Sequence, residues 1–445
     1  MTRSKPADRT RSKHQRDAAT KDWDELVAAL CQRRAASVTK RLVFAYALLV
    51  LVLVGFPLLY TRAEDKGLIP PAPQLLSASS VGVTLTNMLL VSSSVVFIGA
   101  HVSASRASHR QWVLEQLRQR TGKHNADSVS AALADLERDV IGRGDALRFP
   151  LLASLGLLGL FLAIRYLPPR LVQWLLGAYV AAATLVSLTS TLSPLLDMIE
   201  ARLRRSRVRP LGILLSRRLS LFSDTLAFHG RDLVSMAVAA SLLYAYRGAN
   251  GLSAAVLNNV FAASLGVAGI DLLAIGDFQT AVVLLLGLFL YDIFWVFGSE
   301  SIFGDNVMVS VARGIDGPFK FVFFRPRTRL DATREMSMLG LGDLVIPGLF
   351  VALMLRFDNR RAPSSGLATA TPYFWASYLA YALGMVATFL AMAVFHVAQP
   401  ALLYLVPLCL AAPLTRAWFT GELRSLWHYR EPDLDSKQAS VSRSN

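Results

Sequence analysis

Cysteine and charged residues are both scarce in this chain. Only two cysteines, Cys31 and Cys409, occur among 445 residues, which is too few for a disulfide framework. Charged residues make up 17% of the sequence, whereas hydrophobic residues make up 53%. This balance is too apolar for a soluble protein of this length, and many apolar runs reach the length that crosses the hydrocarbon core of a membrane. The sequence therefore predicts an all-α polytopic membrane protein.

Ten apolar segments are long enough to be membrane helices, and the Gly and Pro inside them fit that interpretation. They cover residues 42–60, 82–102, 149–167, 171–196, 231–247, 252–270, 279–298, 336–355, 372–396 and 399–418. The least regular is 252–270, because it contains Asn258 and Asn259. Asp271 and Asp277 fall in the connection after it and are predicted to be interfacial rather than buried. We therefore expect a helical bundle of nine to ten transmembrane helices.

The net charge of +15 favours a membrane topology over a nucleic-acid partner. About three quarters of the 46 Lys and Arg residues fall in the termini and loops that ten spans place on one side of the membrane. Because cytosolic loops carry the excess of these residues, both termini are predicted to be cytosolic. The predicted regions are a basic cytosolic tail (1–41), N-terminal spans (42–105), a cytosolic loop (106–148), a core of membrane helices (149–418) and a cytosolic C-terminal tail (419–445).

Two of the apolar segments each carry one acid, Asp292 in 279–298 and Asp343 in 336–355. An ionised carboxylate at hydrocarbon depth is costly, so such residues default to functional hypotheses. One span ends and the next begins on the same side of the membrane, so at about 1.5 Å per residue both acids lie roughly 8–10 Å below one face. They are expected to meet there and to share one proton. In aspartic proteases, such a pair activates a water and protonates the substrate carbonyl.

The residues around the acids predict a shaped site. Gly340 and Gly342 permit a locally opened helix or the close approach of another backbone. An extended substrate is then expected to pair with the freed polar groups. Tyr291 adjoins Asp292 and is close enough in sequence to hydrogen-bond near the pair. A third element, Gln399-Pro400-Ala401-Leu402, opens the last apolar segment on the same face.

In order and in span context, three short motifs resemble those of the presenilin-type intramembrane aspartyl proteases. Tyr291-Asp292, Gly340-Leu341-Gly342-Asp343 and Pro400-Ala401-Leu402 match the YD, GxGD and PAL motifs of that family. Longer matches, YDIFWVFG at 291–298, MLGLGDLVIPGLF at 338–350 and QPALLYLVP at 399–407, resemble the signal peptide peptidase branch. The resemblance covers residues 149–430 and implies an enzyme of the endoplasmic reticulum membrane. Such an enzyme hydrolyses peptide bonds within signal peptides and other type II membrane segments.

The resemblance also implies roles for individual residues. Asp292 and Asp343 would be the catalytic pair, with no metal or organic cofactor. The residues implied to bind substrate or shape the site are Tyr291, Gly340, Leu341, Gly342, Gln399, Pro400, Ala401 and Leu402. Expected partners are membrane-embedded signal peptides, type II transmembrane segments and the lipid bilayer; a homo-oligomer and the membrane-protein degradation machinery stay open as further partners.

The chain departs from that family pattern in three places. It has ten predicted spans rather than nine, and the additional span is 42–60 or 82–102. The stretch Ser299–Asp305 is longer than expected between the neighbouring matches. The C-terminus lacks the dilysine retrieval signal.

Two other functions stay open at this point. Paired membrane acids also serve proton relays, which would make the chain a proton-coupled transporter or channel. The second alternative function is that of a non-proteolytic membrane scaffold, which holds client proteins for degradation.

Overall fold

The computed structural model describes residues 40–65, 77–120, 139–204, 218–220, 227–304, 307–308, 311, 317–324, 336–361, 371–395 and 399–431. Most of both predicted cytosolic tails lies outside these ranges. The chain divides into two compact units, of which the smaller comprises the N-terminus to Val43 and Leu192–Ser235. The larger unit comprises Phe44–Thr191 and Met236–Asn445 and holds all the predicted site residues.

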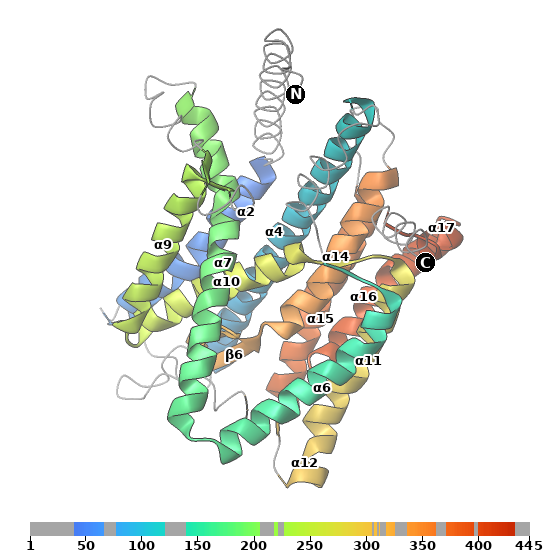
Figure 1. The fold of residues 1–445 in the computed structure, drawn as a ribbon. Helices are drawn as coiled ribbons and strands as arrows, with labels where there is room; N and C mark the ends of the chain where they lie inside the picture. Colours follow the sequence, from blue (N-terminus) through green and yellow to red (C-terminus); the bar gives the residue numbers. More distant parts are fainter. Residues whose placement is uncertain are drawn as a thin grey trace, which may run out of the picture. The chain divides into compact units, whose positions relative to one another are not determined.

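Each of the ten predicted apolar segments contains a helix (Figure 1). The helices are α2 (Lys40–Val50), the π-helix η1 (Leu51–Gly55), α3 (Phe56–Asp65), α4 (Ser77–Arg120), α6 (Arg143–Tyr166), α7 (Pro169–Arg204), α9 (Gly230–Arg247), α10 (Leu252–Leu272), α11 (Phe278–Ile293), the π-helix η3 (Phe294–Gly298), α12 (Ser299–Phe303), α14 (Gly342–Arg361), α15 (Pro372–Phe395), α16 (Leu402–Phe419) and α17 (Leu423–Trp427). Within the described ranges, 8 helices are long and apolar enough to cross a membrane; α9 and α14 do not meet that criterion. The predicted fold class, an all-α polytopic membrane protein, is confirmed.

Within the described residues, three short two-stranded sheets accompany the helices. In the smaller unit, β2 (Arg218–Ser220) pairs with β3 (Ala227–His229). In the larger unit, β1 (Asp139–Ile141) runs parallel to β4 (Leu273–Ile275), directly before α11. There, too, β5 (Lys320–Phe324) pairs antiparallel with β6 (Met336–Gly340), so that Lys320 lies opposite Gly340.

The β5–β6 pair corrects one predicted span. The segment 336–355 was expected to be helical throughout, but its first five residues form β6 and the helix begins at Gly342. A short apolar run is compatible with a buried strand as well as with a helix, and periodicity alone does not separate the two. Here β5 supplies the backbone partners that make the strand tolerable inside a membrane protein.

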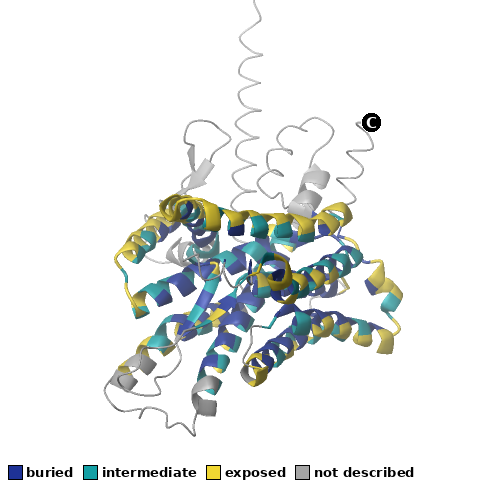
Figure 2. Cartoon of the chain, turned by 90° about the horizontal axis from the view of Figure 1, so that it is seen from below, coloured by how far each residue is buried: buried dark blue, intermediate teal, exposed yellow. Residues whose placement is uncertain are grey.

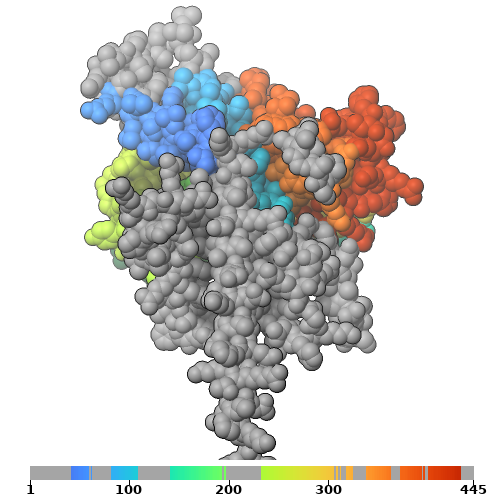
Figure 3. Space-filling view, turned by 90° about the horizontal axis from the view of Figure 1, so that it is seen from above, coloured from blue at the N-terminus to red at the C-terminus, as the bar shows by residue number. Residues whose placement is uncertain are grey.

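The core of the larger unit is built around α4, which contacts α10, α14 and α15. Val91, Val95 and Val96 of α4 are fully buried, as are Phe350 and Val351 of α14. Buried residues gather between the helices, whereas exposed residues follow their outer faces (Figure 2). Figure 3 shows the N-terminal helices beside α4 on one face, where η1 contacts α4. The helices that carry the predicted acids are thus held by well-packed neighbours.

Two acids predicted to be interfacial have separate structural roles. Asp277 is partly buried and caps α11, since its carboxylate accepts the Thr280 N–H at 2.6 Å. Asp271, however, is only 5% exposed and forms an ion pair of 2.7 Å with Arg106 of α4. The prediction was therefore wrong for Asp271, because sequence position alone did not reveal that α4 extends far enough to supply a cation.

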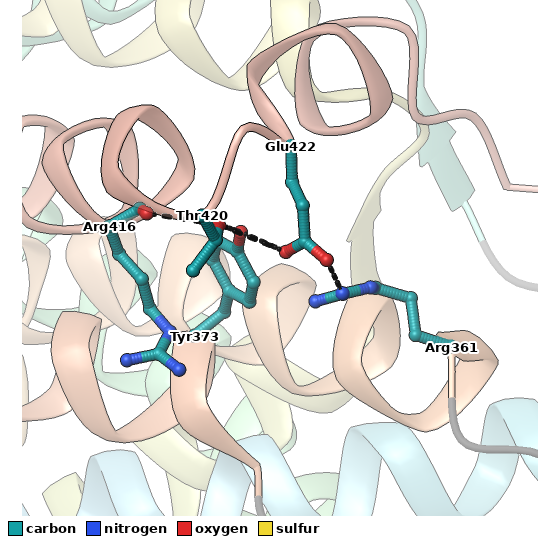
Figure 4. Close-up of polar contacts among 5 residues, drawn as sticks. All are labelled: Arg361, Tyr373, Arg416, Thr420 and Glu422. Atoms are coloured by element: carbon teal, nitrogen blue, oxygen red, sulfur yellow. Dashed lines mark hydrogen bonds and ion pairs between the residues drawn. The ribbon is translucent and has the colours of Figure 1, made fainter.

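A cluster of polar side chains joins the ends of α14, α15 and α16 (Figure 4). Glu422 forms an ion pair with Arg361 and accepts the Tyr373 hydroxyl at 2.7 Å. The guanidinium groups of Arg361 and Arg416 lie over the Tyr373 ring, 5.3 and 5.6 Å from its centroid. These contacts fix the spacing of the three helix ends at the edge of the membrane-spanning region.

The segment that follows α17 is tied to the same end of the core. The Glu431 N–H donates to the Gly276 carbonyl at 2.8 Å, and the Phe278 N–H donates to the Tyr429 carbonyl at 3.3 Å. The Glu431 carboxylate forms a buried ion pair with Arg356 of α14, whose guanidinium also donates to Ser103 at 2.9 Å. This segment therefore connects α11 with α14, and Arg356 in turn connects α14 with α4.

Candidate functional site

Asp292 lies near the end of α11 with only 2% of its surface exposed. Its Oδ2 accepts the backbone N–H of Leu402 at 3.0 Å, across 110 residues of sequence. Directly after it, α11 widens into the π-helix η3, a local distortion that often accompanies functional sites. The predicted acid is therefore buried and joined to the first residue of α16.

The start of α16 explains why the Leu402 N–H is free to make this bond. The first N–H groups of a helix have no partner within the helix, and they favour a negative charge. The Leu403 N–H donates to the Pro400 carbonyl and the Leu405 N–H to the Ala401 carbonyl, both at 3.2 Å. Pro400 and Ala401 are buried, and Gln399 before them is partly buried. The predicted Gln399–Leu402 element thus forms a tight helix start against Asp292.

Asp343 occupies the first turn of α14, immediately after β6. The Leu341 N–H continues the sheet by donating to the Phe319 carbonyl at 3.0 Å, and the Leu341 carbonyl accepts the Val345 N–H at 2.9 Å. Leu341 therefore marks the point where strand becomes helix. A Cβ at Gly340 would lie 3.3 Å from Asp343 Oδ2, so the absence of a side chain at Gly340 leaves room for the carboxyl group.

The two acids lie within electrostatic range of each other, on the neighbouring helices α11 and α14. Tyr291 is partly buried and lies within the same range of both. Tyr381 of α15 is fully buried and within electrostatic range of Asp343, but no sequence pattern singled it out. The structure thus brings together the residues predicted from three separate segments and adds a tyrosine from a fourth.

Asn258 and Asn259, which made 252–270 the least regular segment, hold the β5 strand in place. The Asn258 side chain donates to the Lys320 carbonyl at 2.8 Å. Asn259 donates to the Val322 carbonyl at 2.7 Å and accepts the Val322 N–H at 2.8 Å. Both amides are 5% exposed. Two adjacent buried amides in an apolar helix were the sequence signal for a strand beside it, and that signal was not recognised.

Aromatic residues of η3 and α12, which follow Asp292 in the chain, pack against α6. Trp295 donates its indole N–H to Ser154 of α6 at 3.1 Å and stacks on Phe303, with ring centroids 6.0 Å apart. Buried Ser299 accepts the Val307 N–H at 3.3 Å, which anchors the start of the predicted insertion Ser299–Asp305. Asp305 itself lies outside the described residues. The insertion begins as an ordered continuation of the helix that carries Asp292.

Replacing Asn259 by leucine should weaken the β5 anchor. Asn259→Leu leaves the Val322 N–H and carbonyl without their Asn259 partner in a partly buried site, which costs up to about 1–3 kcal/mol for each group. We expect a clear fall in the thermal unfolding temperature of the purified protein in detergent. Ser253→Ala, at an exposed residue of the same helix, should leave that temperature within about 2 °C, since surface changes are usually small. Equal stability of the two variants would contradict the anchoring role.

Gly384 of α15 allows the close approach of α16 beside the Gln399–Leu402 element. A Cβ at Gly384 would lie 3.1 Å from the Leu405 Cα and 2.9 Å from its side chain. Gly384→Leu must therefore push α16 away and move the Leu402 N–H from Asp292. If the site is catalytic, turnover of a membrane peptide should fall by about tenfold or more, since small misplacements are costly. Gly156→Leu in α6, where no atom of the described residues lies within 4 Å, is the matched control and should retain activity.

Two carboxyl groups on adjacent membrane helices, beside a short strand pair, can exchange protons with a substrate that reaches them in extended form. The arrangement fits a multi-pass membrane enzyme better than a pore, because the two acids lie close together on contacting helices rather than in a chain of separate acids. Fold and site together favour an intramembrane protease.

Comparison with known proteins agrees with this class. Residues 134–433 match the family described as signal peptide peptidase. The chain is 34% identical to the signal peptide peptidase of Mus musculus over 324 residues, covering 70% of this chain and 81% of that protein. It is 34% identical to the signal peptide peptidase of Homo sapiens, covering 67% and 76%, and 33% identical to a probable intramembrane protease of Schizosaccharomyces pombe, covering 67% and 87%.

The chain belongs to the signal peptide peptidase family. This confirms the resemblance noted in the sequence and replaces the transporter or channel interpretation. Intramembrane proteolysis with membrane-embedded substrates is the activity that the family supports. The helices α2, η1, α3 and α4 precede the matched residues.

Proposed function

We propose that this protein is an aspartyl endopeptidase that hydrolyses peptide bonds inside the membrane segments of signal peptides and other type II membrane proteins. Asp292 and Asp343 form its catalytic pair. The observation that supports this most strongly is the meeting of three segments at one point: α11 with Asp292, the start of α14 with Asp343, and the start of α16 with its N–H on Asp292.

In the proposed reaction, one acid of the pair is ionised and the other is protonated, since two close carboxyl groups do not readily ionise together. The ionised acid takes a proton from a water, and the resulting hydroxide attacks the peptide carbonyl carbon. The protonated acid gives its proton to the carbonyl oxygen, which forms a neutral gem-diol. Collapse of that intermediate, with a proton passed to the leaving nitrogen, breaks the C–N bond.

The β5–β6 pair offers a way to present the substrate in extended form. A helical peptide bond is shielded by its own hydrogen bonds, so the substrate must unwind near the acids, and its freed groups need partners inside the membrane. β6 runs directly into the Gly340–Asp343 turn and is bonded to β5 along one edge. Strand addition at its other edge would place a substrate carbonyl near Asp343.

The residues around the pair have supporting roles in this proposal. Pro400, Ala401 and Leu402 form the helix start whose N–H positions the Asp292 carboxyl group, with Gln399 before them. Gly340, Leu341 and Gly342 turn the chain from β6 into α14. Tyr291 lines the site next to Asp292. We also propose residence in the endoplasmic reticulum membrane with both termini cytosolic, in agreement with the distribution of Lys and Arg.

Product mapping tests the substrate class. Purified protein in detergent would be incubated with a synthetic released signal peptide, and the products would be identified by mass spectrometry. The proposal predicts cleavage within the apolar stretch of the peptide. In membranes, a type II segment should be cut and the same segment installed in the opposite orientation should not. Equal cutting in both orientations would contradict the proposed substrate class.

A further inference from the structure

The N-terminal helices that precede the family match form a groove. A cavity of about 370 Å³ lies between η1 and α4 and is lined by Val52, Phe56, Val83, Thr86 and Asn87 among others. η1 lies within the candidate membrane span Leu42–Leu59, and α4 contains the candidate span Gly82–Ser108. Phe56 and Leu90 on its rim are 39% and 40% exposed, so the groove opens toward the surface that lipid covers.

The groove continues inward to the strand that supports the candidate site. A narrow cavity of about 40 Å³ shares Val52, Phe56, Val83 and Asn87 with the groove and reaches Asn259 and Val322. Asn259 is the residue that binds β5, and β5 holds β6 immediately before the Gly340–Asp343 turn. An occupant of the groove that extends into this narrow cavity would therefore contact the support of the β5–β6 pair.

One polar atom in this apolar groove lacks a partner among the described residues. The carboxamide oxygen of Asn87 is buried and accepts no hydrogen bond from them. A buried acceptor without a donor is costly, which makes it a marker for a missing ligand group. Asn87 lies five residues into the span Gly82–Ser108, about 8 Å below its start at 1.5 Å per residue. The missing group is thus a donor located near one end of the hydrocarbon layer.

The unpaired Asn87 oxygen favours a lipid over a peptide helix. A membrane helix uses its backbone N–H groups for its own hydrogen bonds and so has few donors to offer. The volume of the groove falls in the range of small-molecule sites. We propose that it binds the acyl chain of a neutral membrane lipid whose N–H or O–H donates to the Asn87 oxygen. An uncharged lipid suits this depth, because the described residues that line the groove include no charged side chain.

Photolabelling tests this site with ceramide as the probe, since ceramide carries amide and hydroxyl donors. Purified full-length protein in nanodiscs would receive either a photoactivatable ceramide or a photoactivatable phosphatidylcholine, which has no donor. Labelled peptides would be located by mass spectrometry. We expect ceramide to label η1 and the first half of α4 at least fivefold more than phosphatidylcholine does. Excess unlabelled ceramide should remove that signal.

Two variants separate the hydrogen bond from the cavity. Asn87→Leu, which removes the acceptor, should reduce ceramide labelling to the phosphatidylcholine level. Thr86→Trp should fill the groove from its exposed side and reduce labelling by both lipids. Leu155→Trp on the lipid-facing surface of α6, where Leu155 is 66% exposed, is the control and should change neither.

Three results would overturn the proposal. The first is equal labelling by the two lipids, and the second is ceramide labelling that stays unchanged in Asn87→Leu and Thr86→Trp. The third is labelling of the groove by a photoactivatable signal peptide in place of the lipid. Any effect of the lipid on cleavage rests on the proposed protease function, whereas binding does not. Repeating the labelling with Asp343→Asn keeps the two apart, because that variant should bind ceramide normally even though we expect it to be inactive.

Discussion

Replacing either acid of the proposed pair by asparagine should abolish cleavage. Asparagine has nearly the shape of aspartate but neither takes nor gives a proton under these conditions. In the Asp292→Asn variant, the carboxamide oxygen can still accept the Leu402 N–H, so the helix start at α16 should persist. We expect Asp292→Asn and Asp343→Asn each to lower the rate at least roughly a thousandfold, because residues that act as a unit fail together.

The control for this experiment is an acid outside the site. Asp145 is exposed and caps α6, where its carboxylate accepts the Gly142 N–H at 3.2 Å. Asp145→Asn should retain activity within about twofold, since a surface cap contributes mainly to local stability. The double variant Asp292→Asn/Asp343→Asn should be no slower than either single variant. Substantial activity in one single variant would rule out a shared catalytic pair.

Removing Glu431 should have the largest effect on stability. Glu431 and Arg356 are about 5% and 4% exposed, and each neutralises the other. Glu431→Ala leaves a buried guanidinium without its partner, which costs about 3–5 kcal/mol in comparable cases. The free energy of unfolding, measured by denaturant titration in detergent, should fall by that amount. Because the C-terminal segment then loses its buried ion pair with α14, protease sensitivity near residue 431 should also rise.

A second ion pair provides the comparison. Arg361 and Glu422 lie in the cluster of Figure 4, where they are 36% and 28% exposed. Arg361→Ala removes an ion pair screened by water, worth about 1 kcal/mol or less. Replacing both buried partners, as in Arg356→Met/Glu431→Leu, should recover much of the loss caused by Glu431→Ala. If Arg361→Ala proves as destabilising as Glu431→Ala, burial is not what makes the Glu431 pair important.

Local sequence patterns predicted the helices well, because a membrane span leaves a long apolar signature. They did not predict β6, since Met336–Gly340 is apolar in either conformation and its partner β5 lies a dozen residues away. The pairing of Asn259 with β5 and of Asp271 with Arg106 depends on distant segments in the same way. The start of α14 at Gly342 also means that Asp343 lies in the first helical turn rather than several residues inside a helix.

The sequence predicted which residues form the candidate site, but it did not predict how those residues contact one another. Side-chain identities such as Asp292 and Asp343 are visible in a sequence, and membrane acids are rare enough to stand out. The Leu402 N–H that donates to Asp292 is a backbone group, and every residue other than proline carries one. The sequence therefore indicated this hydrogen bond only through the position of Leu402 near Pro400. Tyr381 was missed because an aromatic residue in a membrane helix usually indicates packing alone.

Binding of an aspartyl-protease transition-state analogue tests the central claim most directly. Such an analogue binds tightly only where a site complements the tetrahedral intermediate. The purified wild-type protein would be exposed to a photoactivatable analogue while cleavage of a released signal peptide is followed in the same sample. The account predicts that labelling and loss of cleavage follow the same concentration dependence, and that the labelled peptides come from α11, α14 or the start of α16. Cleavage that continues when the analogue is saturating, or folded wild-type protein that neither cleaves nor labels, would contradict an aspartyl protease at Asp292 and Asp343.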